Sequence, residues 1–184
     1  MLTIVPGVVA RRLVDPRRLG WLNGRRAETR SSFPANRDYI DLRGRTPAQL
    51  GAQLALEDAA WARLASDAYS PRALAEAEQM QRRSPDVPML DFGIASTVVA
   101  LSALGCVPVM SCRGRSLGAH AHQYPAPMAT FYARETHVPV LLRAAEAADV
   151  SLVNTGAKLE VYSEDLRKMR AFAAALRDAI AGRD

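Results

Sequence analysis

The stretch that decides the fold is residues 91–131, DFGIASTVVALSALGCVPVMSCRGRSLGAHAHQYPAPMATF. Residues 93–104 carry apolar side chains at helical spacing, and Asp91 before them is a typical helix N-cap. A glycine ends this helix, and the short apolar run 106–110 predicts a buried strand. A polar loop follows, and residues 127–133 predict a second strand. We therefore expect a helix, a strand, a loop and a strand in this order.

The residues that follow continue this mixture of helices and strands. Residues 139–148 predict a helix that begins at a proline, and residues 150–153 and 159–162 predict two strands joined at an Asn-Thr-Gly turn. Ser163 is expected to cap a last helix that keeps helical spacing up to Gly182. Strands joined by tight turns and by helical connections indicate an α+β fold, with a mixed sheet of about four strands covered by helices.

Two helices are predicted before this core. Residues 46–49, Thr-Pro-Ala-Gln, are a typical helix start, in which Thr is the N-cap and Gln completes a capping box. Ser70-Pro71 starts a second helix, which ends before Ser84-Pro85 because prolines resist the helical conformation around them. Residues 2–5 and 39–42 are candidates for short strands. The expected segments are a basic arm (1–45), a helical pair (46–84) and an α/β core (90–184).

The composition is that of an ordinary globular protein. At 184 residues and 49% hydrophobic content the chain can bury a real core, so disorder is not expected to be its main state. Two cysteines are too few for a disulfide scaffold, and neither a secretory signal nor an apolar run of about 20 residues is present. We expect a soluble cytoplasmic protein that does not interact with membranes.

Positive charge is concentrated near the start of the chain. Residues 11–45 hold ten arginines against four acidic residues, a balance of +6, so the rest of the chain carries −1 of the net +5. Such a block attracts phosphates of nucleic acid or an acidic protein partner. The alternative is a solvated arm, because aromatic residues are not interleaved as a platform for stacking single strands requires.

The candidate chemistry gathers after the strand at 106–110. Cys112 precedes Arg113-Gly114-Arg115, and nearby guanidinium groups favour the thiolate, which is a nucleophile and a metal ligand. A small buried residue that closes the strand is the alternative. The cysteine-phosphatase loop is excluded, because position 118, where that loop needs an arginine, is a glycine. Cys106, inside the apolar run, is expected in the core.

An anion-binding turn is the second candidate in this loop. It consists of Ser111, Arg113, Gly114 and Arg115, where glycine lets the backbone approach a ligand and arginine grips phosphate or carboxylate with two hydrogen bonds. The sequence matches neither a Walker loop nor the Gly-x-Gly-x-x-Gly dinucleotide turn. These residues therefore predict an anionic ligand without naming it.

Two histidines and one glutamate complete the candidates. His120 and His122 lie on one side if their segment is extended, and either could act as an acid or a base. With Cys112 they could hold zinc, but no Cys-x-x-Cys pair accompanies them, so we do not expect a metal. Glu57 falls on the apolar face of the first helix. It is either paired or exposed at an edge, or it is a catalytic base in a cleft with a raised pKa.

The motif Ser111-Cys112-Arg113-Gly114-Arg115, after a helix and an apolar strand, resembles the Ser-Cys-Ser-Gly-Arg motif of the wybutosine-synthesising tRNA methyltransferase family. The resemblance covers roughly residues 90–180 and continues loosely through the strand at 127–133 and the helix after it. It implies an α/β domain that uses S-adenosylmethionine to methylate a modified tRNA base. Of the motif only Ser111, Cys112, Gly114 and Arg115 match. Apart from the resemblance, the residue types and their spacing do not indicate a particular cofactor.

Two functions follow from these patterns. In the first, the chain is a nucleotide- or RNA-related α/β protein, methyltransferase-like, whose ligand turn is assisted by the histidines and whose arm holds phosphates. In the second, it is a non-catalytic subunit of a nucleic-acid-handling or regulatory assembly, and residues 11–45 bind a protein partner. The sequence does not decide whether the protein is an enzyme.

Overall fold

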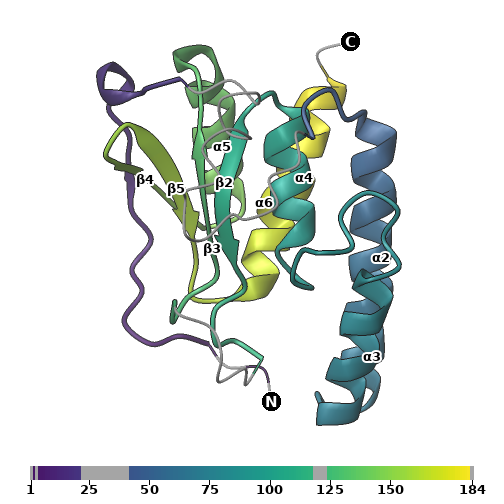
Figure 1. The fold of residues 1–184 in the computed structure, drawn as a ribbon. Helices are drawn as coiled ribbons and strands as arrows, with labels where there is room; N and C mark the ends of the chain where they lie inside the picture. The colour runs from purple at the N-terminus through teal and green to yellow at the C-terminus, as the bar shows by residue number, and fades with distance from the viewer. Residues whose placement is uncertain (1, 3, 22–41, 118–123, 183–184) are drawn as a thin grey trace.

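A mixed sheet of five strands is the frame of the fold (Figure 1). The computed structural model describes residues 2, 4–21, 42–117 and 124–182. The order of the strands across the sheet is β1-β4-β5-β3-β2, in which β1 runs parallel to β4 and the other neighbours are antiparallel. The strands are β1 (Arg12–Leu13), β2 (Val107–Cys112), β3 (Met128–Tyr132), β4 (Ser151–Thr155) and β5 (Lys158–Tyr162). The α+β prediction is confirmed, and β1 adds a fifth strand to the expected four.

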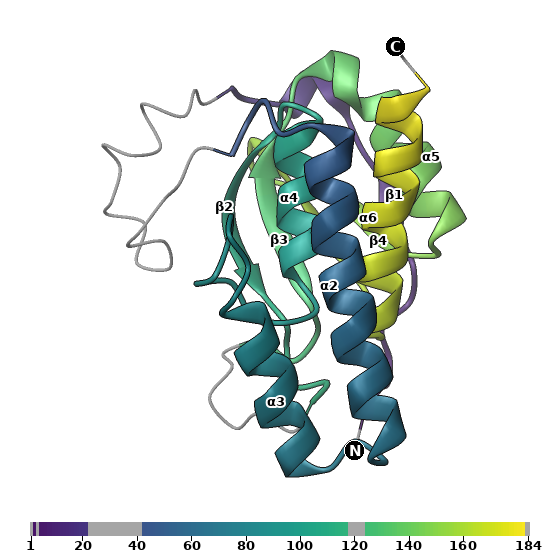
Figure 2. The same ribbon diagram turned by 90° about the vertical axis from the view of Figure 1, so that its right-hand side faces the viewer.

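The helices cover one face of the sheet in two layers. Figures 1 and 2 show α4 and α6 between the sheet and an outer pair formed by α2 and α3, with α5 beside α6. The helices are α2 (Pro47–Ser66), α3 (Pro71–Gln81), α4 (Ala95–Ala103), α5 (Val138–Ala147) and α6 (Leu166–Ala181), with 3-10 turns η1 (Pro16–Arg18) and η2 (Glu135–His137). None of the described helices is both long and apolar enough to cross a membrane.

One hydrophobic core joins the sheet to the helices and includes part of the helical pair. Leu50 and Leu54 of α2 belong to the same buried cluster as Leu101 of α4, Phe131 of β3 and Phe172 of α6. Each of these side chains is at most 1% exposed, so each contributes about 1.5–3 kcal/mol from burial. The outer helices therefore pack as part of the core that supports the sheet.

The helix starts follow local chemistry where the sequence offers a cap. The Thr46 hydroxyl accepts a hydrogen bond from the Gln49 backbone N–H at 3.2 Å, and the Gln49 side chain accepts one from the Thr46 N–H at 3.0 Å. This confirms the predicted capping box. The Ser70 hydroxyl likewise accepts a hydrogen bond from the Ala73 N–H at 3.1 Å at the start of α3. Both helix starts are therefore capped by hydrogen bonds between residues only three positions apart.

Two predicted caps are wrong. Asp91 does not cap α4, because Gly93 adopts a φ of 86°, in the left-handed region, and the helix begins only at Ala95. Ser163 does not cap α6. The cap is Asp165, whose carboxylate accepts a hydrogen bond from the Arg167 N–H at 2.9 Å. The Ser163 hydroxyl instead accepts one from the Asp165 N–H.

The predicted strand at residues 2–5 is also wrong. Leu2, Ile4 and Val5 are not in a strand, and a turn follows at Pro6-Gly7. The N-terminal strand forms later, at Arg12–Leu13, where the chain lies beside β4. Of the candidate strand at 39–42, residues 39–41 lie outside the described residues.

Candidate functional site

The turn after β2 is built around Gly114. This glycine has a φ of 66°, and a Cβ added to it would lie 2.5 Å from the Ala126 carbonyl carbon and 2.7 Å from the Pro127 nitrogen. The next residue, Arg115, donates its backbone N–H to the Pro125 carbonyl at 3.0 Å. The turn is thus pressed against the segment that leads into β3, and no residue with a side chain fits at position 114 without a shift of backbone.

The two arginines of the turn have different environments. The Arg113 guanidinium is 8% exposed and forms an ion pair with the Glu78 carboxylate of α3 at 2.6 Å. The Arg115 side chain is exposed and makes no ion pair or side-chain hydrogen bond with any described residue. Of the two predicted anion-binding arginines, Arg113 is therefore engaged within the fold, and Arg115 is open to a ligand.

Ser111 and Cys112 point to opposite faces of the sheet. Ser111 pairs with Ala129, whose side chain is in the core beneath the helices, whereas Cys112 pairs with Met128 on the other face. The Cys112 sulfur is 3.3 Å from the Gly114 N–H, which donates to it, and the residue is 7% exposed. The structure thus brings Cys112 and Gly114 together and places Ser111 apart from them. Cys106 is fully buried as predicted, and burial raises its pKa.

The predicted histidines, His120 and His122, lie outside the described residues. Within the described part of the chain, no group of three or more His, Cys, Asp or Glu side chains is arranged to hold a metal ion.

Glu57 is separate from the turn, because it lies between the two helix layers. Its carboxylate is fully buried and accepts hydrogen bonds from the Ser96 backbone N–H at 2.8 Å and from the Ser96 hydroxyl at 2.7 Å. Burial raises the pKa of Glu57 to about 7, and hydrogen bonds from Ser96 and Gln53 partly oppose this rise. Helix α4 has no side-chain cap of its own, so Glu57 of α2 caps it from outside.

A buried polar network adjoins Glu57 and ties the outer helices together. The Gln53 amide donates to the Gln81 side-chain carbonyl at 2.9 Å, and the Gln81 amide donates to the Val87 backbone carbonyl at 2.9 Å. The Ser84 hydroxyl completes the network by donating to Gln53 at 2.8 Å. These groups satisfy one another within the fold, as buried polar groups must. We therefore assign Glu57 and its neighbours to the framework.

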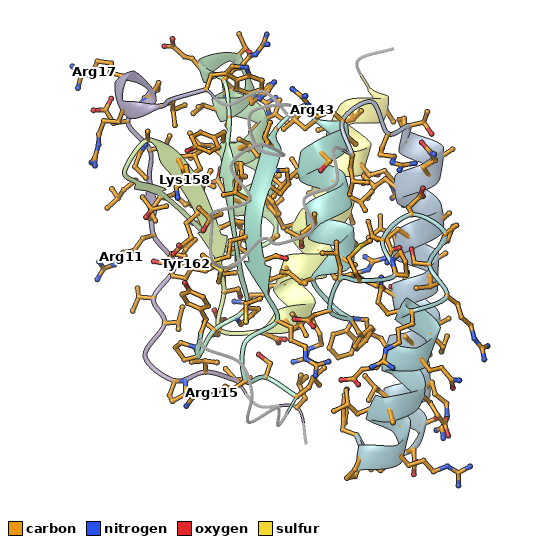
Figure 3. All side chains as sticks on the ribbon, in the orientation of Figure 1. Arg11, Arg17, Arg43, Arg115, Lys158 and Tyr162 are labelled. Carbon is orange, nitrogen blue, oxygen red and sulfur yellow. The ribbon has the colours of Figure 1, made fainter. Side chains whose placement is uncertain are left out.

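The second face of the sheet, defined here as the face turned away from the helices, carries the remaining chemistry. Strand pairing aligns one row of side chains across it, and Figure 3 shows its members Arg11 and Tyr162 on the side of the sheet away from the helices. Arg11 enters the row because its backbone N–H donates to the Ser151 hydroxyl at 3.0 Å. The row, called the Arg11–Cys112 row below, consists of Arg11, Ser151, Tyr162, Met128 and Cys112.

The Arg11–Cys112 row ends at the turn that carries Arg115. Figure 3 places Arg115 at the lower end of the sheet, below Tyr162. The Arg11 side chain is exposed and, like Arg115, makes no ion pair with any described residue. Tyr162 is half-buried. The second face therefore carries Tyr162 together with two exposed arginines, Arg11 and Arg115.

A neighbouring row limits where negative charge can sit. Glu160 lies beside Tyr162 on the same face, paired across the sheet with Thr130 and Val153. The Thr130 hydroxyl donates to its carboxylate at 3.4 Å, and burial raises the pKa of Glu160. The second face therefore carries one carboxylate beside Tyr162, with Lys158 two residues from it on the same face.

Aromatic side chains cover the part of the second face near β2. Trp21 and Tyr132 pack against Val107 and Val109, and the Arg134 guanidinium lies over the Trp21 ring at 4.4 Å from its centroid. The part of the face over β1, β4 and β5 is more open, and Leu13 there is 69% exposed.

The chain matches no protein-family model, no curated protein and no solved structure. Function has to be argued from the site itself.

Sequence reasoning missed Arg11 and Tyr162 as site residues. The alternation Lys-Leu-Glu-Val-Tyr at 158–162 predicts a strand with a polar and aromatic face, which was the available signal for Tyr162. Arg11 is one of ten arginines between residues 11 and 45, and no feature of the neighbouring sequence distinguishes it from the others. Its place depends on pairing with β4, about 140 residues later in the chain.

Proposed function

We propose that this protein binds a phosphate-bearing nucleotide ligand, RNA in the first place, on the second face of its sheet. The observation that carries the proposal is the half-buried Tyr162 with the exposed Arg11 and Arg115 on the same side of the sheet. An aromatic ring stacks on a base of any identity, and an arginine binds phosphate with two hydrogen bonds. The net charge of +5 favours the approach of a polyanion.

The resemblance to the tRNA methyltransferase family extends this proposal to S-adenosylmethionine. Of the residues that match the family motif, Arg115 is exposed, and Cys112 and Gly114 shape the turn that presents it. We propose this turn as the contact for the anionic part of a ligand. Methyl transfer to RNA is the activity that the resemblance adds.

The test is fluorescence anisotropy with a labelled tRNA and calorimetry with S-adenosylmethionine. We expect tRNA to bind the wild-type protein, and we expect Arg11→Ala, Arg115→Ala and Tyr162→Ala each to weaken binding by about fivefold or more. Arg143→Ala is the matched control, because Arg143 is exposed on α5 behind the opposite face. Equal binding by all four variants would remove the second face from consideration. Heat from S-adenosylmethionine, lost in Arg115→Ala, would support the methyltransferase-like function.

A second candidate function is that of a non-catalytic subunit held by a protein partner. Val9 and Leu13 favour it, since they are 68% and 69% exposed and extend the second face beyond Arg11. Exposed apolar side chains grouped at a sheet edge are typical of protein contacts. Deletion of residues 1–45 should abolish association with that partner in a pull-down, and an unchanged complex would count against this function.

A further inference from the structure

The open edge of the sheet at β1 has the features of a site for an added strand. In the described part of the chain β1 is the last strand on this side of the sheet, and Figure 1 shows its segment, in purple, outside β4. Arg11 turns its backbone toward β4, because its N–H donates to the Ser151 hydroxyl and its carbonyl accepts from the Leu152 N–H at 2.7 Å. In an extended chain the groups of the next residue point the other way, so the N–H and carbonyl of Arg12 face the open edge.

The side chains along this edge alternate between exposed and half-buried. Val9, Arg11 and Leu13 are exposed, whereas Ala10 and Arg12 between them are half-buried. This is the pattern of an extended strand, in which every second side chain lies on the same face. Val9 and Leu13 are 68% and 69% exposed, so the edge presents an apolar, a basic and an apolar side chain in turn. Peptides added to a sheet edge gain affinity from the backbone and specificity from such alternate side chains.

The charge of the edge is positive and complements an acidic partner. Residues 11–18 hold four arginines against one aspartate, a balance of +3. The Arg12 guanidinium forms an ion pair with Asp149 at 3.1 Å, whereas the Arg11 side chain makes no ion pair with any described residue. A carboxylate on a neighbouring strand, directly opposite Arg11, would complete a cross-strand ion pair.

A second copy of this chain fits the edge less well. An antiparallel pair of β1 segments that sets Val9 of one copy opposite Leu13 of the other also sets Arg11 opposite Arg11. Like charges directly opposite one another destabilise a pair of strands. A peptide with a carboxylate at this position makes the same apolar contacts without the repulsion.

We propose that the β1 edge binds an extended, acidic segment of a partner protein as an added antiparallel strand. The segment carries a carboxylate opposite Arg11 and an apolar residue two positions away on each side, opposite Val9 and Leu13. Antiparallel pairing follows because it is slightly more stable per residue than parallel pairing. This inference is independent of RNA binding. It rests on the second candidate function, a subunit held by a protein partner, and states where and through which motif that partner is bound.

The probe is a labelled synthetic peptide, Thr-Thr-Val-Thr-Glu-Thr-Val-Thr-Thr, measured by fluorescence anisotropy with the full chain. We expect saturable binding that weakens about fivefold or more when the peptide glutamate is replaced by lysine. Arg11→Glu should bind the glutamate peptide more weakly by a similar factor and should bind the lysine peptide more tightly than the wild type does. Arg18→Glu is the matched control, because Arg18 is also exposed and its replacement changes the net charge equally, but it lies in η1 outside the strand. This control should keep the preference of the wild type for the glutamate peptide.

Two further measurements separate strand addition from general attraction between charges. N-methylation of the two threonines beside the peptide glutamate removes the N–H groups that face β1 in an antiparallel strand, and it should abolish binding. Val9→Ser and Leu13→Ser should each weaken peptide binding about threefold, since each removes one apolar cross-strand contact. Tyr162→Ala should retain peptide binding, because Tyr162 belongs to β5, which is separated from β1 by β4.

Equal losses in Arg11→Glu and Arg18→Glu, or full binding of the N-methylated peptide, would overturn strand addition at β1. A wild-type protein that fails to bind the glutamate peptide would overturn it too, whether or not tRNA binds, so the proposed RNA binding is judged by its own assay. Loss of the protein partner on deletion of residues 1–45, without any peptide binding, would keep the second candidate function and move its contact away from β1. Dimers of the wild-type protein that Arg11→Glu strengthens, seen by sedimentation, would assign the edge to a second copy and overturn this inference.

Discussion

Replacement of Glu57 by glutamine should remove most of the dependence of stability on pH between about 4.5 and 7. Burial raises the pKa of Glu57 from 4.5 to about 7 in the folded protein. At about 1.4 kcal/mol for each pKa unit, the difference between the pKa of Glu57 in the folded and unfolded states corresponds to about 3 kcal/mol of folding free energy. Because the pKa is raised on folding, this stabilisation is complete below pH 4.5 and is lost as pH rises to 7. Above pH 7 the folded protein must keep the Glu57 carboxylate ionised in a buried position, which is unfavourable.

Glutamine preserves the geometry without the charge. Its carbonyl oxygen can accept from the Ser96 N–H, and its amide can donate to the Ser96 hydroxyl, so both contacts at the start of α4 remain. Glu57→Gln should therefore match the wild type in stability near pH 5 and exceed it by up to about 3 kcal/mol at pH 8.

The assay is urea unfolding of both proteins at pH 5, 6, 7 and 8, followed by circular dichroism. Glu146→Gln is the control, because Glu146 is exposed on α5 and its neutralisation changes charge without changing the core. The reasoning is refuted if the difference between Glu57→Gln and the wild type stays constant from pH 5 to 8. A loss of several kcal/mol by the variant at every pH would refute it too, since it would mean that the ionised form is required by α4.

Other changes separate the parts of the turn and of the second face. Gly114→Ala should lower the free energy of unfolding by about 2–4 kcal/mol and Gly156→Ala by about 1 kcal/mol. Both glycines have positive φ, but only at position 114 would the added Cβ clash with neighbouring backbone atoms. Equal losses for the two variants on urea unfolding would contradict this. Arg113→Ala should lower the free energy of unfolding by about 1–3 kcal/mol because the ion pair with Glu78 is lost. Arg115→Ala should change it by at most about 0.5 kcal/mol. A larger loss of thermal stability in Arg115→Ala than in Arg113→Ala would be evidence against this. Glu160→Gln should tighten RNA binding about twofold by removing about 0.5 kcal/mol of repulsion, and weaker binding in anisotropy would mean that its carboxylate contacts the ligand.

The elements predicted correctly are those whose signals are local. The capping box at Thr46 is contained in four residues, and the apolar runs of β2, β3 and β5 carry their own periodicity. Strand β1 has two residues and depends on a partner far along the chain, so no local pattern could reveal it. The α4 start was mispredicted because Asp91 is a good cap residue by type, while the backbone conformation of Gly93 decided the boundary.

The candidate site shows the same division between local and distant causes. Arg113 and Arg115 have the same side chain two positions apart, and burial with an ion pair to Glu78 of α3 distinguishes Arg113 from the exposed Arg115. Glu57 stood out in the sequence as a carboxylate on an apolar helix face, but its partner, Ser96, lies on a different helix. Residue type identified the candidates, and long-range packing determined which of them are buried and which are exposed.

The pairing of β1 with β4 also determines when the second face is completed during synthesis. Arg11 leaves the ribosome early, but it joins the Arg11–Cys112 row only after residues 151–155 have emerged. Such non-local pairing forms slowly, because the chain between the partners must be closed first. Until then Arg12 and Leu13 have no strand partner, and exposed apolar side chains such as Val9 and Leu13 favour aggregation. The pairing of β1 with β4 therefore forms only after most of the chain has been synthesised.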